Sequence, residues 1–412
     1  MKKVLVIGAG IGQVPISQLV KQRGYYLIVV TIQGNYPCID IADKVYYVDI
    51  FDRGAVLDIA KKEKVDAVIS DQNDLMMPTV AYISEHLDLP GNTFSQVNSY
   101  CNKNIFRENC NKLSIPSPKH ARVLSTKIPL DFEDVPFPWM VKPEDSQSSI
   151  GVAKVNSKEE YISAITYALK CSRNHAAIVE EFFVGDEIVV EGFIYKGEYY
   201  NLGFADRRYF NLPNLFIPNQ TIFPSVVSDQ IKAECIRYEQ TMCQYISPSF
   251  AIVHSEYLVN QSTSDVRIVE SALRGGGVYI SSHLLPMACG IDINSYLLDC
   301  AVGIETDFKY IYNHSEDSKS SAYVCFYLPK GPVTSIDGID DLMSLPYVHK
   351  CDLDIFIGME TKEMTYKGQR LGPIIISGED RQDIEAKIKS IQLLLTIKVD
   401  GSGSLNSDII WC

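Results

Sequence analysis

Two glutamates, Glu256 and Glu270, each lie where an apolar, strand-like run ends. Carboxylates on neighbouring strand ends can hold Mg²⁺ together, because this ion prefers hard oxygen ligands and usually shares them with the phosphates of a nucleotide. Arg274 follows the second glutamate by four residues and offers a planar cation for a phosphate or a carboxylate. These residue types predict phosphate chemistry, with Glu256 and Glu270 as the metal ligands.

Two lysines upstream are candidates for the same phosphates. Lys142 ends an apolar strand and is followed by a loop of small residues that includes Ser148, Ser149 and Gly151. Backbone N–H groups of such a loop can point at phosphate oxygens, and a lysine at the strand end supplies a point cation. Lys103 lies earlier, on a segment expected to be helical. A solvated lysine beside an ordinary surface turn is the alternative interpretation.

A connector between two expected strands carries Glu180, Glu181 and Phe182, and Glu187 begins the second strand. The backbone of such a connector can bond the edge of an adenine while an apolar side chain packs on the base. Glu187 could then bond ribose hydroxyls. An acidic hairpin turn is the plainer alternative.

His254 precedes Glu256 by two residues, so the two side chains share one face of a strand. A buried structural histidine and a catalytic one both remain open for this position. Arg207 and Arg208, next to Asp206 at the end of another expected strand, are further candidates for contacts with phosphate or substrate.

Strand and helix signals alternate along residues 1–95, which predicts a parallel, doubly wound sheet. A second α/β region is expected over residues 96–312, and the segment 313–400 has the pattern of a small α+β unit. Residues 401–412 begin with a Gly-Ser composition typical of a flexible tail. The apolar run Leu353–Ile357 is expected to be one of the C-terminal strands.

Composition excludes several classes of function. The 412 residues include 38 Lys and Arg against 51 Asp and Glu, so a net charge of −13 gives no general attraction for nucleic acid. No apolar run reaches the ~20 residues that span a bilayer. The 11 cysteines lack CxxC pairs and metal-ligand spacing, which predicts reduced thiols in a cytoplasmic protein without zinc.

In their order along the chain these motifs resemble the ATP-grasp superfamily, and within it the carboxylate–amine ligases. Lys103 resembles the first ATP lysine and Lys142 the second, and Ser146–Gly151 resembles the mobile phosphate loop. The connector Val179–Phe182 resembles the adenine hinge, and Glu187 the acid that binds ribose. The resemblance implies that these residues bind ATP.

The same resemblance assigns roles to the second half of the chain. Glu256 and Glu270 match the two magnesium carboxylates, and Arg274 matches the arginine that holds the acyl phosphate of the substrate. Ala272 stands where the family motif often has an asparagine ligand, so one metal contact must come from elsewhere. The candidate catalytic residues are Arg274, Glu270 and His254.

The outer parts of the chain are similar to two branches of the superfamily. Residues 1–95 resemble the Rossmann-like domain of purine-biosynthesis ligases, and residues 313–400 resemble the last domain of L-amino-acid ligases. The implied fold is a mixed α/β ATP-grasp fold with an N-terminal parallel-sheet domain, a lid subdomain at about 120–185, and a small C-terminal α+β domain.

The implied function is ATP-dependent ligation of a carboxylate to an amine, an amino acid among the expected amines, through an acyl phosphate. The expected cofactors are ATP and Mg²⁺ or Mn²⁺, the partners are the two small substrates, and a homodimer is the usual assembly of such enzymes. Two alternatives stay open. One is an ATP-grasp carboxylase or formyl-transfer enzyme of purine-type synthesis, and the other is a nucleotide-binding protein without catalysis.

Overall fold

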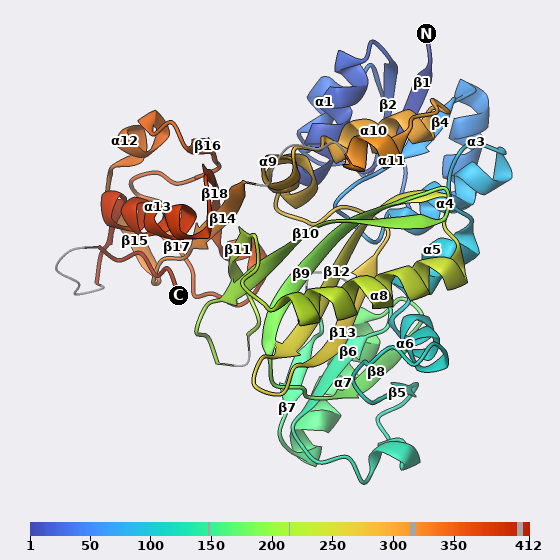
Figure 1. Cartoon of the computed structure of the whole chain (residues 1–412). Coiled ribbons are helices and arrows are strands. Elements are labelled where there is room, and N and C mark those ends of the chain that lie inside the picture. Colours follow the sequence, from blue (N-terminus) through green and yellow to red (C-terminus); the bar gives the residue numbers. More distant parts are fainter. Residues whose placement is uncertain (147–148, 214, 314–318, 402–406) are drawn as a thin grey trace.

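The structure, a computed structural model, describes residues 1–146, 149–213, 215–313, 319–401 and 407–412. Within these residues the strands form four sheets, and helices pack on their faces (Figure 1). The loop residue Ser148 and residues 402–406 of the expected flexible tail lie outside the described residues.

The N-terminal part is a parallel sheet with strand order β3-β2-β1-β4. It contains β1 (Lys3–Ile7), η1 (Ile11–Gln13), α1 (Val14–Gln22), β2 (Tyr26–Thr31), α2 (Cys38–Ile41), β3 (Lys44–Tyr47), α3 (Arg53–Glu63), β4 (Ala67–Ile69) and α4 (Met77–His86). Successive residues of β1 pack into two different hydrophobic clusters, because both faces of the sheet are covered. The predicted parallel sheet is confirmed.

Two helices, α5 (Phe94–Cys101) and α6 (Lys103–Lys112), lead into a small antiparallel sheet with strand order β5-β8-β6-β7. Its elements are β5 (His120–Val123), η2 (Leu130–Phe132), β6 (Trp139–Pro143), β7 (Ala153–Val155), α7 (Lys158–Cys171) and β8 (Ala177–Glu181). Trp139 and Tyr161 are buried between this sheet and α7, with their rings edge to face. Figure 1 shows this sheet as a separate layer, at the bottom of the view.

An eight-stranded sheet forms the centre of the molecule, with strand order β13-β12-β9-β10-β11-β14-β18-β16. The strands are β9 (Asp186–Tyr195), β10 (Glu198–Tyr209), β11 (Pro218–Phe223), β12 (Phe250–Asn260), β13 (Asp265–Ala272), β14 (Ser320–Phe326), β16 (Val348–Cys351) and β18 (Leu371–Gly378). The helices that follow its strands are α8 (Asp229–Ile246), η3 (Ile280–Leu284), α9 (Leu285–Cys289), α10 (Ile293–Ala301) and α11 (Phe308–Asn313). β11 and β14 are hydrogen-bonded from Gln220↔Val324 to Phe223↔Ser321, so the C-terminal strands continue the central sheet without a break.

The C-terminal part adds β15 (Gly331–Asp337), α12 (Ile339–Ser344), β17 (Glu360–Thr361), η4 (Lys367–Gln369), α13 (Arg381–Leu394) and β19 (Thr396–Val399). The strand expected at Leu353–Ile357 is wrong. The backbone N–H of Asp352 donates to the carbonyl of Pro373, and beyond it the chain leaves β16, the edge strand of the central sheet, without forming another strand. It packs Leu353 and Ile355 against the C-terminal core and exposes Phe356 and Ile357.

Residues 407–412 of the expected flexible tail are packed rather than free. Ile410 pairs with Tyr327 in an antiparallel bridge, and the ring of Trp411 lies 4.9 Å from that of Phe326. The domain boundaries at 95, 312 and 400 stay predictions.

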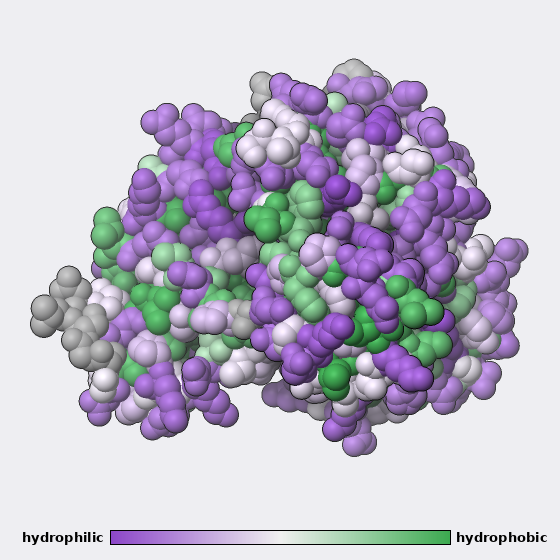
Figure 2. All heavy atoms as spheres, turned by 90° about the horizontal axis from the view of Figure 1, so that it is seen from below, coloured by the Kyte–Doolittle hydropathy of each residue, from purple (hydrophilic) through white to green (hydrophobic). Residues whose placement is uncertain are grey.

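None of the helices in the described part of the chain is long and apolar enough to cross a membrane. The face shown in Figure 2 carries apolar residues in small groups among polar ones.

Candidate active site

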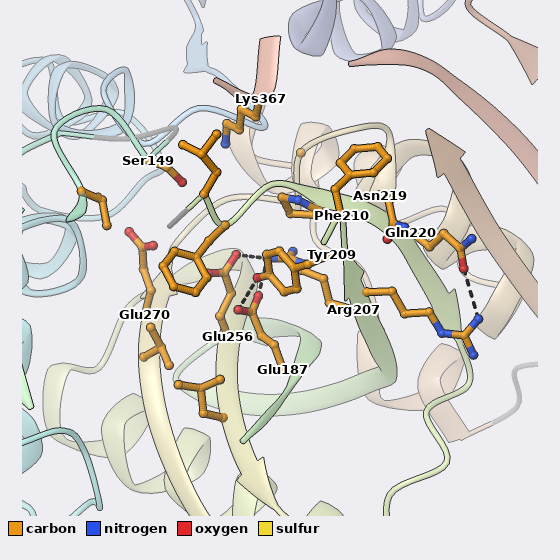
Figure 3. A pocket seen from close by; sticks show the side chains of 18 of the residues that line it. Ser149, Glu187, Arg207, Tyr209, Phe210, Asn219, Gln220, Glu256, Glu270 and Lys367 are labelled. Carbon is orange, nitrogen blue, oxygen red and sulfur yellow. Dashed lines mark hydrogen bonds and ion pairs between the residues drawn. The ribbon is translucent and has the colours of Figure 1, made fainter. Parts of the chain in front are cut away.

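A cavity of about 1070 Å³ opens where the central sheet, the small antiparallel sheet and the C-terminal part meet. Its walls come from the loop after β4, from β6, the β8–β9 connector, β10, β12 and β13, and from η4 and α13. Figure 3 shows several of the polar side chains that point into it.

Glu256 and Glu270 lie directly opposite each other on β12 and β13. Residues opposite each other in an antiparallel pair project from the same face, and both glutamates line the cavity. The two predicted metal ligands are therefore brought together. Their carboxylates are hard oxygen donors that suit Mg²⁺ or Mn²⁺. No group of three or more His, Cys, Asp or Glu residues with metal-site geometry occurs among the described residues, so the pair would need further ligands.

Arg207 holds two of the predicted carboxylates. Its guanidinium donates to Glu187 at 2.8 Å and also to Glu256. The hydroxyl of Tyr209 donates to Glu187 as well (Figure 3). Burial raises the pKa of Glu187, and the nearby charge of Glu256 raises it further. Arg207 thus neutralises the acidic side of the cavity. Its position next to Asp206 in the sequence does not indicate these ion pairs with Glu187 and Glu256.

His254 lies between two carboxylates and is only 4% exposed. Its Nδ1 contacts the buried Glu191, and its Nε2 lies 3.4 Å from Glu256. Burial alone would lower the pKa of His254, but the charge of Glu191 and the hydrogen bonds to Glu191 and Glu256 together raise it. The side chain lines the cavity, but both of its ring nitrogens face carboxylates, so its geometry suits a role in positioning Glu256.

Lys142 makes an ion pair with Glu180 at 2.5 Å, and Arg107 of α6 donates to the other oxygen of that carboxylate at 2.7 Å. Burial alone would raise the pKa of Glu180, but the charges of Arg107 and Lys142 lower it to about 2. The Glu180 side chain is therefore occupied by two cations and fixes Lys142, while the adenine contact expected of the connector concerns its backbone and stays a prediction. Sequence reasoning missed Arg107, because it lies 73 residues from Glu180.

Lys103 is the first residue of α6 and joins the predicted phosphate loop to the carboxylates. Its Nζ donates to the carbonyl of Ser146 at 2.8 Å and lies 3.5 Å from Glu270. Ser149 lines the cavity with a positive φ of 59°. Gly151 is not among the lining residues, so its place in the loop is conformational, with a φ of +76°. Ser148, also predicted to bind phosphate, lies outside the described residues.

Arg274 is held by a residue from the N-terminal part. Its Nε and Nη2 donate to the two oxygens of Asp74 at 2.9 and 2.7 Å. Burial alone would raise the pKa of Asp74, but the charge of Arg274 lowers it. Asp74 was missed by the sequence analysis. It follows β4, and the carboxyl end of a parallel strand is where such sheets place ligand-binding side chains, a signal that could have found it.

Three further predicted residues also line the cavity. Arg208 donates to Gln220 at 3.2 Å and to Glu385 of α13 at 2.6 Å, and it is half exposed. Phe182 lines the cavity, and the Nζ of Lys154 lies 4.1 Å from the centre of its ring. Glu181 also lines the cavity and accepts from the backbone of Lys119 at 3.0 Å.

The C-terminal part contributes a lysine that the motifs do not include. Lys367 of η4 lines the cavity opposite the acidic residues (Figure 3). Burial lowers the pKa of Lys367 to about 8, and the charge of Arg370 acts in the same direction.

Two family models match parts of the chain: "D-ala D-ala ligase C-terminus" over residues 115–200 and "L-amino acid ligase C-terminal domain 2" over residues 324–400. Among curated proteins, the alanine–anticapsin ligase of Bacillus subtilis (strain 168) is 24% identical over 249 residues, which are 54% of this chain and 51% of that protein. A formate-dependent phosphoribosylglycinamide formyltransferase of Saccharolobus solfataricus is 26% identical over 193 residues, 44% of this chain and 47% of the relative. The chain thus spans about half the length of these relatives.

Solved structures extend the likeness to nearly the whole chain. The L-amino acid ligase from Bacillus licheniformis has a TM-score of 0.83 at 17% identity, over 97% of this chain and 99% of that one. The phosphoribosylglycinamide synthetase from Anaerococcus prevotii has a TM-score of 0.77 at 18% identity, over 97% and 100%. The predicted mixed α/β fold is confirmed. In fold and in its two matched segments, the chain resembles the ATP-grasp carboxylate–amine ligases.

Proposed function

We propose that the protein is an ATP-dependent ligase that activates a carboxylate as an acyl phosphate and joins it to an amine, an amino acid among the candidates. The observation that carries the proposal is the position of Glu256 and Glu270 opposite each other on β12 and β13, in one cavity with Lys103, Lys142 and Arg274. Two carboxylates and three cations around one cavity suit a nucleoside triphosphate with a divalent ion.

The side chains divide the work of phosphoryl transfer. Lys103 and Lys142 bind the α- and β-phosphates, and Glu256 and Glu270 hold the Mg²⁺. The ion, when bound, offsets the charge that develops as the γ-phosphoryl group leaves. Because such transfer involves little covalent work by the protein, positioning and charge neutralisation supply most of the rate.

The reaction has two balanced steps. An oxygen of the substrate carboxylate attacks the γ-phosphorus and ADP leaves, which gives an acyl phosphate. The amine then attacks the acyl carbon, inorganic phosphate leaves, and the amine nitrogen gives up a proton. Arg274 orients the acyl phosphate, and its own position is set by Asp74. Residues from the Ser146–Gly151 loop exclude water that would hydrolyse the intermediate.

A carboxylase or formyl-transfer enzyme is the second candidate. The likeness to phosphoribosylglycinamide formyltransferases and the fold shared with phosphoribosylglycinamide synthetase favour it. The match of residues 324–400 to an L-amino acid ligase domain favours the ligase.

A phosphate-release screen separates the two. The protein is incubated with ATP and Mg²⁺ and with pairs of amino acids, or with bicarbonate or formate alone. Release of phosphate that requires both an acid and an amine supports the ligase. Release with bicarbonate alone, or with formate alone, supports the alternative, and ATP binding without any release would point to a non-catalytic nucleotide-binding protein.

A further inference from the structure

The cations that line the cavity differ in whether a carboxylate neutralises them. Lys142 is paired with Glu180, and Arg274 with Asp74. The remaining paired cations are Lys103 with Glu270, Arg207 with Glu187 and Glu256, and Arg208 with Glu385. These cations carry little free charge, because each has a carboxylate within 4 Å.

Lys367, Arg370 and the exposed Lys389 are the exceptions among the described residues of the cavity wall, and of these Lys367 and Arg370 are the two that are not fully exposed. The structure gives neither of them an ion pair with a carboxylate of the described residues. Arg370 donates to the carbonyl of Pro218 at 2.6 Å, and its guanidinium lies 5.7 Å from the centre of the Tyr323 ring. Lys367 has no hydrogen-bond partner among the described residues, and Figure 3 shows its amino nitrogen turned into the cavity.

The turn that carries Lys367 is fixed in place. The side chain of Gln369 accepts hydrogen bonds from the backbone of Thr365 at 2.7 Å and of Tyr366 at 3.2 Å. Arg370 immediately precedes β18, which pairs with β14 of the central sheet. Because both ends of the turn are held, the backbone of Lys367 is presented to the cavity at a constant place.

The surroundings of Lys367 are those of a site for an anion. Burial lowers the pKa of Lys367, followed by Arg370, while Glu256 opposes the shift and Arg207 and Arg274 add to it. Of these cations, Arg370 is the one without a carboxylate partner among the described residues, so its repulsion of Lys367 is not offset by an ion pair. A negatively charged ligand relieves that repulsion and is bound by charge-assisted hydrogen bonds.

We propose that Lys367, with Arg370 beside it, forms an oxyanion subsite that the C-terminal part adds to the cavity. This inference rests on the proposed function and deepens it. The ligand group is a phosphate or a carboxylate, and it has two possible sources: the terminal phosphate of the nucleotide, or an acidic group of the acid substrate. Lys367 would then select for a negatively charged partner in the activation step.

Covalent labelling tests the subsite in the wild-type protein. Pyridoxal 5′-phosphate is an anionic aldehyde that reacts with amines near oxyanion sites, and borohydride reduction fixes the adduct for peptide mass spectrometry. Lys389 is the matched control, because it lines the same cavity but is exposed. We expect Lys367 to be labelled at least fivefold faster than Lys389. Equal rates would overturn the proposal.

Protection identifies the source of the oxyanion. If ATP slows the labelling of Lys367 and ADP does not, the terminal phosphate is the ligand. If ADP protects only together with inorganic phosphate or acetate, the substrate oxyanion is the ligand. Labelling that none of these additions slows contradicts the subsite. Protection by inorganic phosphate alone tests the oxyanion subsite without nucleotide or turnover. The subsite can therefore fail or hold independently of the proposed ligase function.

Substitution gives an independent measurement. Lys367→Met keeps the length and removes the charge, and Lys367→Arg restores a cation. For a terminal-phosphate ligand we expect the Met variant to bind ATP about tenfold more weakly with ADP affinity unchanged, in line with the loss of one charged hydrogen bond. For a substrate ligand, ATP affinity is unchanged and KM for the acid rises about tenfold. Equal behaviour of Lys367→Met and Lys389→Met in both measurements would remove the subsite.

Discussion

Arg274 and Asp74 form a two-pronged ion pair across 200 residues of chain, with Nε–Oδ1 at 2.9 Å and Nη2–Oδ2 at 2.7 Å. Planar pairs of this kind fix the direction of the guanidinium as well as its position. A second aspartate of the same loop, Asp71, accepts from the backbone of Gly275 at 2.8 Å and from the hydroxyl of Ser281 at 2.7 Å. The N-terminal part therefore sets the geometry of the loop that begins at Arg274.

Replacing Asp74 with Asn should impair turnover more than nucleotide binding. The amide keeps the shape but loses the charge, so Arg274 is held less firmly for the acyl phosphate. We expect kcat to fall by about tenfold to a hundredfold, with the KM for ATP within about twofold of wild type. The Asn73→Ala variant, at the neighbouring position, is the control. An increase in the KM for ATP with kcat unchanged would contradict the positioning role.

Replacing Glu270 with Gln should leave the fold intact and abolish most activity. Its side chain is 36% exposed in the cavity, so the loss of charge costs little stability. The variant loses one of the two metal carboxylates, and we expect acid- and amine-dependent ADP release to fall by about 10² or more. Asp265→Asn, at the other end of β13, should retain full turnover. Wild-type ADP release by the Gln variant would exclude the metal role.

Glu180 makes the stability of the protein depend on pH in the acidic range. Its pKa falls from the ordinary 4.5 to about 2 in the folded protein, so its contribution is complete above about pH 4.5 and is lost as pH falls towards 2. The shift corresponds to about 3 kcal/mol. Glu180→Gln should be less stable than wild type at pH 7, and the difference should shrink near pH 3. Urea midpoints at both pH values measure it, and a difference independent of pH would refute the assignment.

Gly151 and Gly277 should respond differently to replacement by Ala. A Cβ at Gly151 would lie 2.6 Å from Pro143 Cγ at a φ of +76°, whereas a Cβ at Gly277 meets nothing within 4 Å. We expect Gly151→Ala to destabilise the protein by roughly 1–3 kcal/mol and Gly277→Ala by less than about 0.5 kcal/mol. Thermal unfolding of the two variants checks this, and equal shifts in Tm would show that the contact at Gly151 is relieved by a small movement.

The local pattern of the sequence predicted the elements and the metal pair. Apolar, strand-like runs identified β12 and β13, and the carboxylates at Glu256 and Glu270 lie opposite each other because the strands are antiparallel neighbours. The run Leu353–Ile357 is also apolar but forms no strand: Leu353 and Ile355 pack against the C-terminal core, and composition alone does not show whether such a run also finds a strand to pair with.

The partners of the site residues could not be predicted in the same way. Arg107 meets Glu180 and Asp74 meets Arg274 only after the chain has folded, and sequence separations of 73 and 200 residues leave no local signal. Lys367 lies in a short turn without any motif, and only the three-dimensional arrangement shows it in the cavity. The sequence thus indicated which side chains could take part in the site, and the fold determined which of them form ion pairs with each other.

The continuous sheet through β11 and β14 limits how the cavity can open. Moving the C-terminal part outward would break the backbone hydrogen bonds between β11 and β14, from Gln220↔Val324 to Phe223↔Ser321. The cavity wall that the C-terminal part forms is therefore fixed to the central sheet. The small antiparallel sheet of β5 to β8, on the opposite side of the cavity, is a separate sheet with its own hydrophobic core. Admission of a nucleotide and departure of the products would then depend on movement of this small sheet alone.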